Sequence, residues 1–80
     1  MRNIGSKSSA WLHAVGISGL EDLRRIGALE AFLRVKWAGF NASLNLLWAL
    51  DGALNDCPWN RLPAGGREAL LLALHEAERA

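Results

Sequence analysis

The stretch NIGSKSSAWL (residues 3–12) is echoed downstream by RIGALEAFL (residues 25–33). In each copy an apolar residue precedes a glycine, and an alanine followed by another apolar residue comes four or five positions later. This pattern predicts a tight turn that leads into a helix, because glycine tolerates positive φ and alanine lets two helices approach closely. The first N–H groups of such a helix have no partner within it and can receive an anion. The pattern therefore predicts a helical fold with a candidate phosphate-binding turn.

The composition indicates one small domain that covers residues 1–80. Hydrophobic residues make up 51% of the chain, which is ample for a single core. The formal net charge of +1 excludes a general attraction to nucleic acid. The charge is nevertheless uneven: residues 1–36 hold 6 basic and 3 acidic side chains, a net of +3, whereas residues 37–80 hold 3 and 5, a net of −2. This asymmetry favours an anionic partner on the N-terminal half.

The sequence also bears on location. Cys57 is the single cysteine, so no intrachain disulfide forms and a reducing cytoplasm is the expected compartment. The N-terminus lacks the uninterrupted apolar segment of a secretory signal. No apolar run approaches the roughly 20 residues that cross a bilayer. We therefore expect a cytoplasmic protein without membrane contact.

Residues of high helix propensity dominate, and no segment alternates with period two for long enough to suggest a sheet. The fold class is predicted as all-α, a compact bundle of about five short helices. The expected helices cover residues 6–15, 18–26, 28–38, 43–54 and 63 to near the C-terminus. Ser6 is the predicted N-cap of the first helix, and Ser18 and Glu21 have the spacing of a capping box at the second. Gly16, Gly27 and Gly39 are expected to end the first three helices.

Apolar positions predict which surfaces are buried. Segment 43–54 is apolar nearly all round, which places it in the middle of the domain or at an interface. The predicted stripe of the third helix consists of Leu29, Phe32, Leu33 and Trp37. The last helix is expected to place Leu70, Leu71 and Leu74 on one face, with Leu72 pointing elsewhere. We expect the core to contain Trp11, Trp37 and Trp48, with Trp59, in the loop after Pro58, covering one end.

A second set of residues points to a known family. The set consists of Ile4-Gly5, Trp11-Leu12, Gly16-Ile17, Glu21-Asp22-Leu23, Ile26-Gly27-Ala28, SLNLLWAL at 43–50, Gly52-Ala53-Leu54, Trp59 and Leu62-Pro63. In this order the segments resemble the C-terminal domain of the TfoX/Sxy competence regulators over nearly the whole chain. The resemblance implies helix-hairpin-helix-like (SAM/HhH-like) elements in the N-terminal half. It also implies regulation of DNA-uptake genes together with the cyclic-AMP receptor protein.

The regulators of this family also carry an N-terminal domain, which has no counterpart in this sequence. Two alternatives stay open: a stand-alone family member, and a piece whose partner domain lies elsewhere.

Two sets of site residues follow. The candidate phosphate or DNA contacts are Arg2, Gly5, Ser6, Lys7, Ser8, Arg24, Arg25 and Lys36. Their alternative interpretation is structural, since a glycine turn can serve only to pack helices and a basic residue can serve only as a solvated face. In the second turn Glu30 lies in the first helical turn, where a carboxylate competes with phosphate. The candidate protein interface consists of Leu46, Trp48 and Leu72.

The sequence gives little support for catalysis or metal binding. His13 and His75 lie on separate helices, Cys57 has no neighbouring histidine, and Asp56-Cys57 matches no usual ligand spacing. We therefore expect no enzyme activity, no cofactor, no metal and no small-molecule substrate. The leading prediction is a regulatory module that binds a protein partner or a second copy of itself. The alternative is DNA binding through phosphate contacts of the basic half.

Overall fold

Five α-helices build the part of the chain that the computed structural model describes, residues 4–56 and 64–79. They are α1 (Ser6–Ala14), α2 (Leu20–Ile26), α3 (Ala28–Trp37), α4 (Leu44–Leu54) and α5 (Ala64–Arg79). The predicted all-α class is confirmed, and the first four helices begin and end within two residues of their expected bounds. The helix-hairpin-helix-like description of the N-terminal half stays a prediction. The expectations for Arg2, Cys57, Pro58, Trp59 and Pro63 lie outside the described residues.

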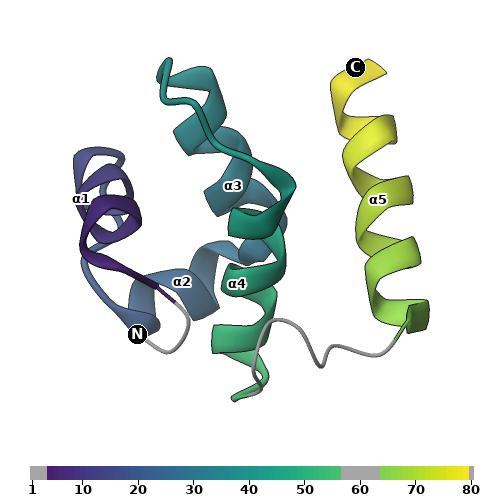
Figure 1. The fold of residues 1–80 in the computed structure, drawn as a ribbon, viewed down its shortest axis with the longest axis horizontal. Helices are drawn as coiled ribbons and strands as arrows, with labels where there is room; N and C mark the ends of the chain where they lie inside the picture. Colours follow the sequence, from purple (N-terminus) through teal and green to yellow (C-terminus); the bar gives the residue numbers. More distant parts are fainter. Residues whose placement is uncertain (1–3, 57–63, 80) are drawn as a thin grey trace.

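The helices α3 and α4 pack against each other at the centre of the fold, with α1 and α2 on one side and α5 on the other (Figure 1). The helix α3 contacts each of the other four helices. Its buried side chains explain why: Ala28, Ala31, Phe32 and Val35 recur at helical spacing, and Leu33 adds a second direction of packing. A helix with so much buried surface can serve as the common partner of its neighbours.

Glycines with positive φ end three helices, as predicted. Gly16 has φ +88° and Gly39 has φ +97°. After α1, the N–H of Gly16 donates to the carbonyl of His13 and the N–H of Ile17 to that of Leu12. These two bonds form a Schellman motif, which satisfies carbonyls at the helix end. Gly39 and Phe40 repeat the motif after α3, so both helices end where glycine adopts the left-handed conformation.

Gly27 alone joins α2 to α3. Its φ is +92°, its N–H donates to the carbonyl of Leu23 over 2.7 Å, and its carbonyl accepts from Ala31 over 3.0 Å. One residue therefore closes one helix and starts the next. The second glycine turn of the sequence is thus confirmed as a sharp bend, and Ala31, fully buried, lies where close helix approach was expected.

The first glycine turn differs from its prediction in three details. Gly5 is itself the N-cap of α1, with an extended backbone at φ −79°, so glycine is not required there by its conformation. Ser6 is the first helical residue rather than the N-cap, and no side chain caps α1. Ala10 is exposed and makes no close helix approach. Residues 3–12 and 25–33 are therefore similar in sequence but differ in backbone geometry.

One cluster of buried side chains runs through all five helices. It includes Leu12 of α1, Leu23 of α2, Phe32 of α3, Leu47 of α4 and Leu74 of α5. Each such side chain contributes about 1.5–3 kcal/mol by leaving water. Five consecutive residues of α4, Leu46 to Leu50, are buried, which confirms the predicted central position of this helix.

Trp37 is the clear error among the core predictions, because 68% of its surface is exposed. It is the last residue of α3, and the helix carries Val35 into the core instead. Trp11 is half-buried and Trp48 is buried, as expected.

Candidate functional site

Three of the predicted phosphate contacts, Arg24, Arg25 and Lys36, already have carboxylate partners within the chain. The Arg24 guanidinium lies 3.5 Å from Glu21, and that of Arg25 lies 3.0 Å from Asp22. The Lys36 Nζ lies 2.9 Å from a carboxylate oxygen of Glu78, which ties α3 to α5. Because each of these cations lies beside a carboxylate, the local net positive charge that the three can offer to a nucleic acid backbone is small.

Arg34, the other basic residue of α3 beside Lys36, is paired in the same way. Its guanidinium lies 2.8 Å from Glu30 across one helical turn. The side chains of both residues are partly exposed.

The start of α1 holds the remaining predicted contacts. Gly5, Ser6 and Lys7 are exposed and Ser8 is half-buried. No acidic residue lies in the first turn and no side chain caps it, so the backbone N–H groups are open to an anion. The Lys7 Nζ lies 5.4 Å from the centroid of the Trp11 ring, in a cation–π arrangement. The fold keeps these residues apart from Lys36, which reaches α5 on the other side of the molecule (Figure 1).

Asp22 carries the capping role that was predicted for Glu21. Its carboxylate accepts hydrogen bonds from the Ser18 N–H over 3.0 Å and from the Ser18 hydroxyl over 2.9 Å. The capping box of Ser18 and Glu21 is therefore wrong by one residue, because Gly19 and not Ser18 is the N-cap of α2. The bond from the Ser18 backbone, followed by that from its side chain, lowers the pKa of Asp22 below 3.8. Partial burial raises the pKa of Asp51, on α4.

The three predicted interface residues divide between interior and surface. Leu46 is 6% exposed and Trp48 is 8% exposed, so both belong to the core. Leu72 is 62% exposed on α5, as its position off the apolar face predicts. Arg67 of α5 lies over the Trp48 ring, 5.6 Å from its centroid, and helps to cover it.

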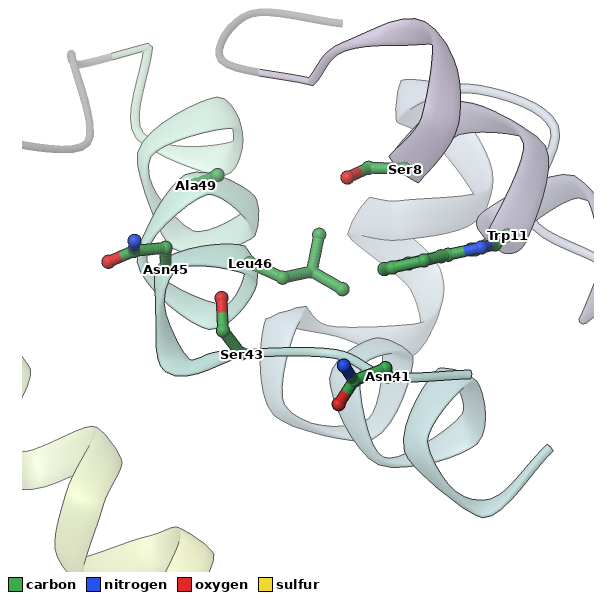
Figure 2. Close-up of a pocket in the computed structure, with 7 residues that line it drawn as sticks. All are labelled: Ser8, Trp11, Asn41, Ser43, Asn45, Leu46 and Ala49. Atoms are coloured by element: carbon green, nitrogen blue, oxygen red, sulfur yellow. The ribbon is translucent and has the colours of Figure 1, made fainter. Parts of the chain in front are cut away.

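A pocket of about 380 Å³ lies between α1 and the start of α4 (Figure 2). Its lining residues are Ser8, Trp11, Asn41, Ser43, Asn45, Leu46 and Ala49. Figure 2 shows Trp11 and Leu46 pointing toward each other from the two helices. Trp11 stacks on Phe40, with ring centroids 5.6 Å apart and planes at 22°. Sequence reasoning missed this pocket, although the polar positions Asn41, Ser43 and Asn45, two apart along the chain, were a visible signal.

The described residues contain no group of three or more His, Cys, Asp or Glu side chains that could hold a metal ion. His13 and His75 are both exposed, on α1 and α5. None of the helices in residues 4–56 and 64–79 has the length and apolar character of a membrane span.

These features define the class of the protein as a small all-α module with a mixed polar and apolar pocket. The chain belongs to the TfoX C-terminal domain family, whose sequence model matches residues 1–74. The resemblance noted in the sequence is thereby confirmed.

Two known proteins are similar to the chain. The DNA transformation protein TfoX of Haemophilus influenzae is 35% identical over 77 residues, which cover 96% of this chain and 36% of that protein. The chain thus spans about a third of the length of this relative. The crystal structure of an uncharacterized protein from Listeria monocytogenes superimposes with a TM-score of 0.88 at 28% identity, covering 98% of this chain and 89% of the other.

Proposed function

We propose that the chain is a non-enzymatic module in the regulation of DNA transformation, and that it acts by binding a protein. The link to transformation comes from the family and from the relative named for that process. A domain that makes up about a third of a longer relative supports a role in contacts between parts of a regulator. This role requires a surface rather than a catalytic centre.

The observation that carries the proposal is the pairing of cations with carboxylates on the basic half. Arg24, Arg25 and Lys36 each lie within 3.5 Å of an acidic side chain. Affinity for nucleic acid depends on the number of phosphates neutralised, so paired cations support it poorly. Binding to a protein partner does not require cations that are free to neutralise phosphates.

Two exposed apolar side chains are available to contact a protein. Trp37 is 68% exposed and Leu72 is 62% exposed. Aromatic residues are enriched where proteins bind one another, and charged residues are depleted there. Leu72 belongs to the predicted interface, and Trp37 is added to it here.

The experiment measures self-association, which is the form of protein binding that the purified chain can show alone. Sedimentation velocity from about 10 µM to 1 mM should give a rising sedimentation coefficient, because association follows mass action. Leu72→Glu or Trp37→Ser should weaken the association at least about tenfold, equivalent to about 1.4 kcal/mol. Leu44→Ser, at a residue that is 42% exposed at the start of α4, is the control and should leave it unchanged. A monomer at all concentrations, or equal losses in all three variants, would contradict this form of the proposal.

DNA binding is the second candidate, and the start of α1 favours it. Ser6, Lys7 and Ser8 surround an uncapped helix start that has no acidic residue in its first turn. The test is a fluorescence-anisotropy titration with duplex and single-stranded DNA at low salt. DNA binding predicts an affinity that falls steeply with salt and is abolished by Lys7→Glu, whereas Arg79→Glu on α5 should have a smaller effect. Flat titrations would remove this candidate.

A further inference from the structure

The pocket between α1 and α4 contains hydrogen-bonding groups that the fold itself does not use. Ser8, Asn41 and Ser43 line it, and their side chains make no hydrogen bond to any other residue in 4–56 or 64–79. Ser43 is the N-cap of α4, yet its side chain makes no capping bond. A serine hydroxyl and an asparagine amide each offer both a donor and an acceptor. The polar part of the pocket is therefore complementary to a ligand that carries both hydrogen-bond donors and hydrogen-bond acceptors.

The charge of the lining narrows the class of ligand. None of the seven residues that line the pocket in the described chain is charged. The Lys7 ammonium, although it lies on α1, sits over the Trp11 ring and not among the lining residues. A charged ligand would give up water without gaining an ionic partner among the lining residues. The lining thus favours an uncharged ligand.

The apolar part of the pocket distinguishes a peptide from a nucleobase. It consists of Trp11, Leu46 and Ala49. Phe40 already stacks on the Trp11 ring at a centroid distance of 5.6 Å, which occupies one of its two faces. In Figure 2 the edge of the indole extends toward Leu46. An indole edge and a leucine form a surface for an aliphatic side chain rather than a platform on which a base stacks.

We infer that this pocket binds an uncharged segment of a partner's polypeptide chain. The main-chain amides of the partner's segment form hydrogen bonds with the side chains of Ser8, Asn41 and Ser43. One aliphatic side chain of the segment lies against Trp11 and Leu46. Peptide groups carry the required donor and acceptor side by side. The volume of about 380 Å³ lies within the usual range for a specific ligand, about 300–1,000 Å³. The inference rests on the proposed function in one respect, that the partner is a protein.

The test uses N-acetyl-leucine-N-methylamide, which carries two peptide groups and one aliphatic side chain. The full chain, labelled with ¹⁵N, is titrated with this probe and separately with sodium phosphate and thymidine. Saturable chemical-shift changes are expected for the Trp11 indole N–H and the Asn41 side-chain amide with the peptide probe only. The double variant Ser8→Ala/Asn41→Ala should raise the dissociation constant at least about tenfold, since it removes two hydrogen bonds. Ser9→Ala, at the neighbouring exposed serine of α1, is the matched control and should bind like the unmodified chain.

Three results would overturn the inference: no saturable shift with the peptide probe, equal binding by the double variant, or shifts at the lining residues with phosphate or thymidine alone. The Leu72→Glu variant separates this inference from the proposed function. Leu72 lies on α5, outside the pocket lining. The variant should therefore lose self-association and keep the peptide-probe shifts. The reverse pattern, association intact and probe binding absent, would leave the proposed function standing and remove the pocket.

Discussion

Single residues decide where this chain bends. Gly16, Gly27 and Gly39 adopt φ values near +90° at the ends of α1, α2 and α3. An added Cβ would meet no atom within 4 Å at any of these positions. The need for glycine there arises from backbone conformation and not from crowding, because L-residues with a side chain are strained in the left-handed region.

Gly27→Ala is expected to lower the free energy of unfolding by about 1–3 kcal/mol, because φ 92° with ψ 155° is a backbone conformation that only glycine adopts readily. The control is Gly66→Ala within α5, where φ is not positive and no atom lies within 4 Å of the added Cβ. It should leave stability unchanged or raise it by up to about 1 kcal/mol, because alanine is the better helix former. Urea unfolding of both variants checks the pair. Equal losses in the two would mean that backbone conformation is not the cause.

Asp22 gives the chain a stability that depends on pH. Its pKa is lowered in the folded state by the bonds from Ser18, so its contribution is complete above the unfolded value near 3.8 and is lost as the pH falls through the folded value. Asp22→Asn should therefore flatten the acid side of the stability profile, measured by thermal unfolding between about pH 6 and pH 2. Asp51, whose pKa is raised, acts in the opposite direction and stays unchanged in both proteins. A variant profile parallel to that of the unmodified chain would contradict this role of Asp22.

At the scale of the elements, α4 and α5 differ in how many of their side chains are buried in the core. The helix α4 buries all its residues from Leu46 to Leu50, whereas α5 buries Leu74 and only partly buries Leu70, Leu71 and Ala77. An ion pair, Lys36–Glu78, also joins α5 to α3, and both side chains are partly exposed. Exposed ion pairs contribute little, because solvent screens them. The apolar face therefore docks α5.

The contributions of the apolar face and of the ion pair to the docking of α5 can be compared with two substitutions. Leu74→Ala, at a residue that is 4% exposed, should lower the free energy of unfolding by about 2–5 kcal/mol. Lys36→Gln should lower it by less than about 1 kcal/mol, and by less still at high salt. Denaturant titrations at two salt concentrations measure both effects. A larger loss for Lys36→Gln than for Leu74→Ala would contradict docking by the apolar face.

At the scale of the whole molecule, one buried cluster connects all five helices. Because α3 contacts each of the others, removing any helix exposes part of the same core. Small single-core proteins of this kind unfold in one cooperative step. We expect far-ultraviolet circular dichroism and tryptophan fluorescence to give coincident thermal transitions. Separate midpoints, with helix content lost before the tryptophan signal changes, would show that α5 leaves the core independently.

The fold followed from the sequence to a large extent, for reasons visible at named positions. The helix ends at Gly16, Gly27 and Gly39, the central position of α4 and the exposure of Leu72 all depend on local conformation or on the spacing of apolar residues. The wrong predictions concern the ends of helices, where a shift of one residue changes which side chain is buried or forms a capping bond. Trp37 falls at the end of α3 beyond the reach of the core, and Asp22 rather than Glu21 meets Ser18 because α2 begins at Gly19.

The candidate sites depended on the tertiary structure. Sequence could list the basic residues, but only the packing of α3 against α5 brings Lys36 to Glu78. Only the approach of α1 to the start of α4 creates the pocket that joins Ser8 and Trp11 to Asn41 and Ser43. Helices are determined by neighbours within a few residues of one another, and sequence therefore reveals them. A pocket and its charge are determined by side chains that are distant along the chain, and only their arrangement in space decides what the surface can bind.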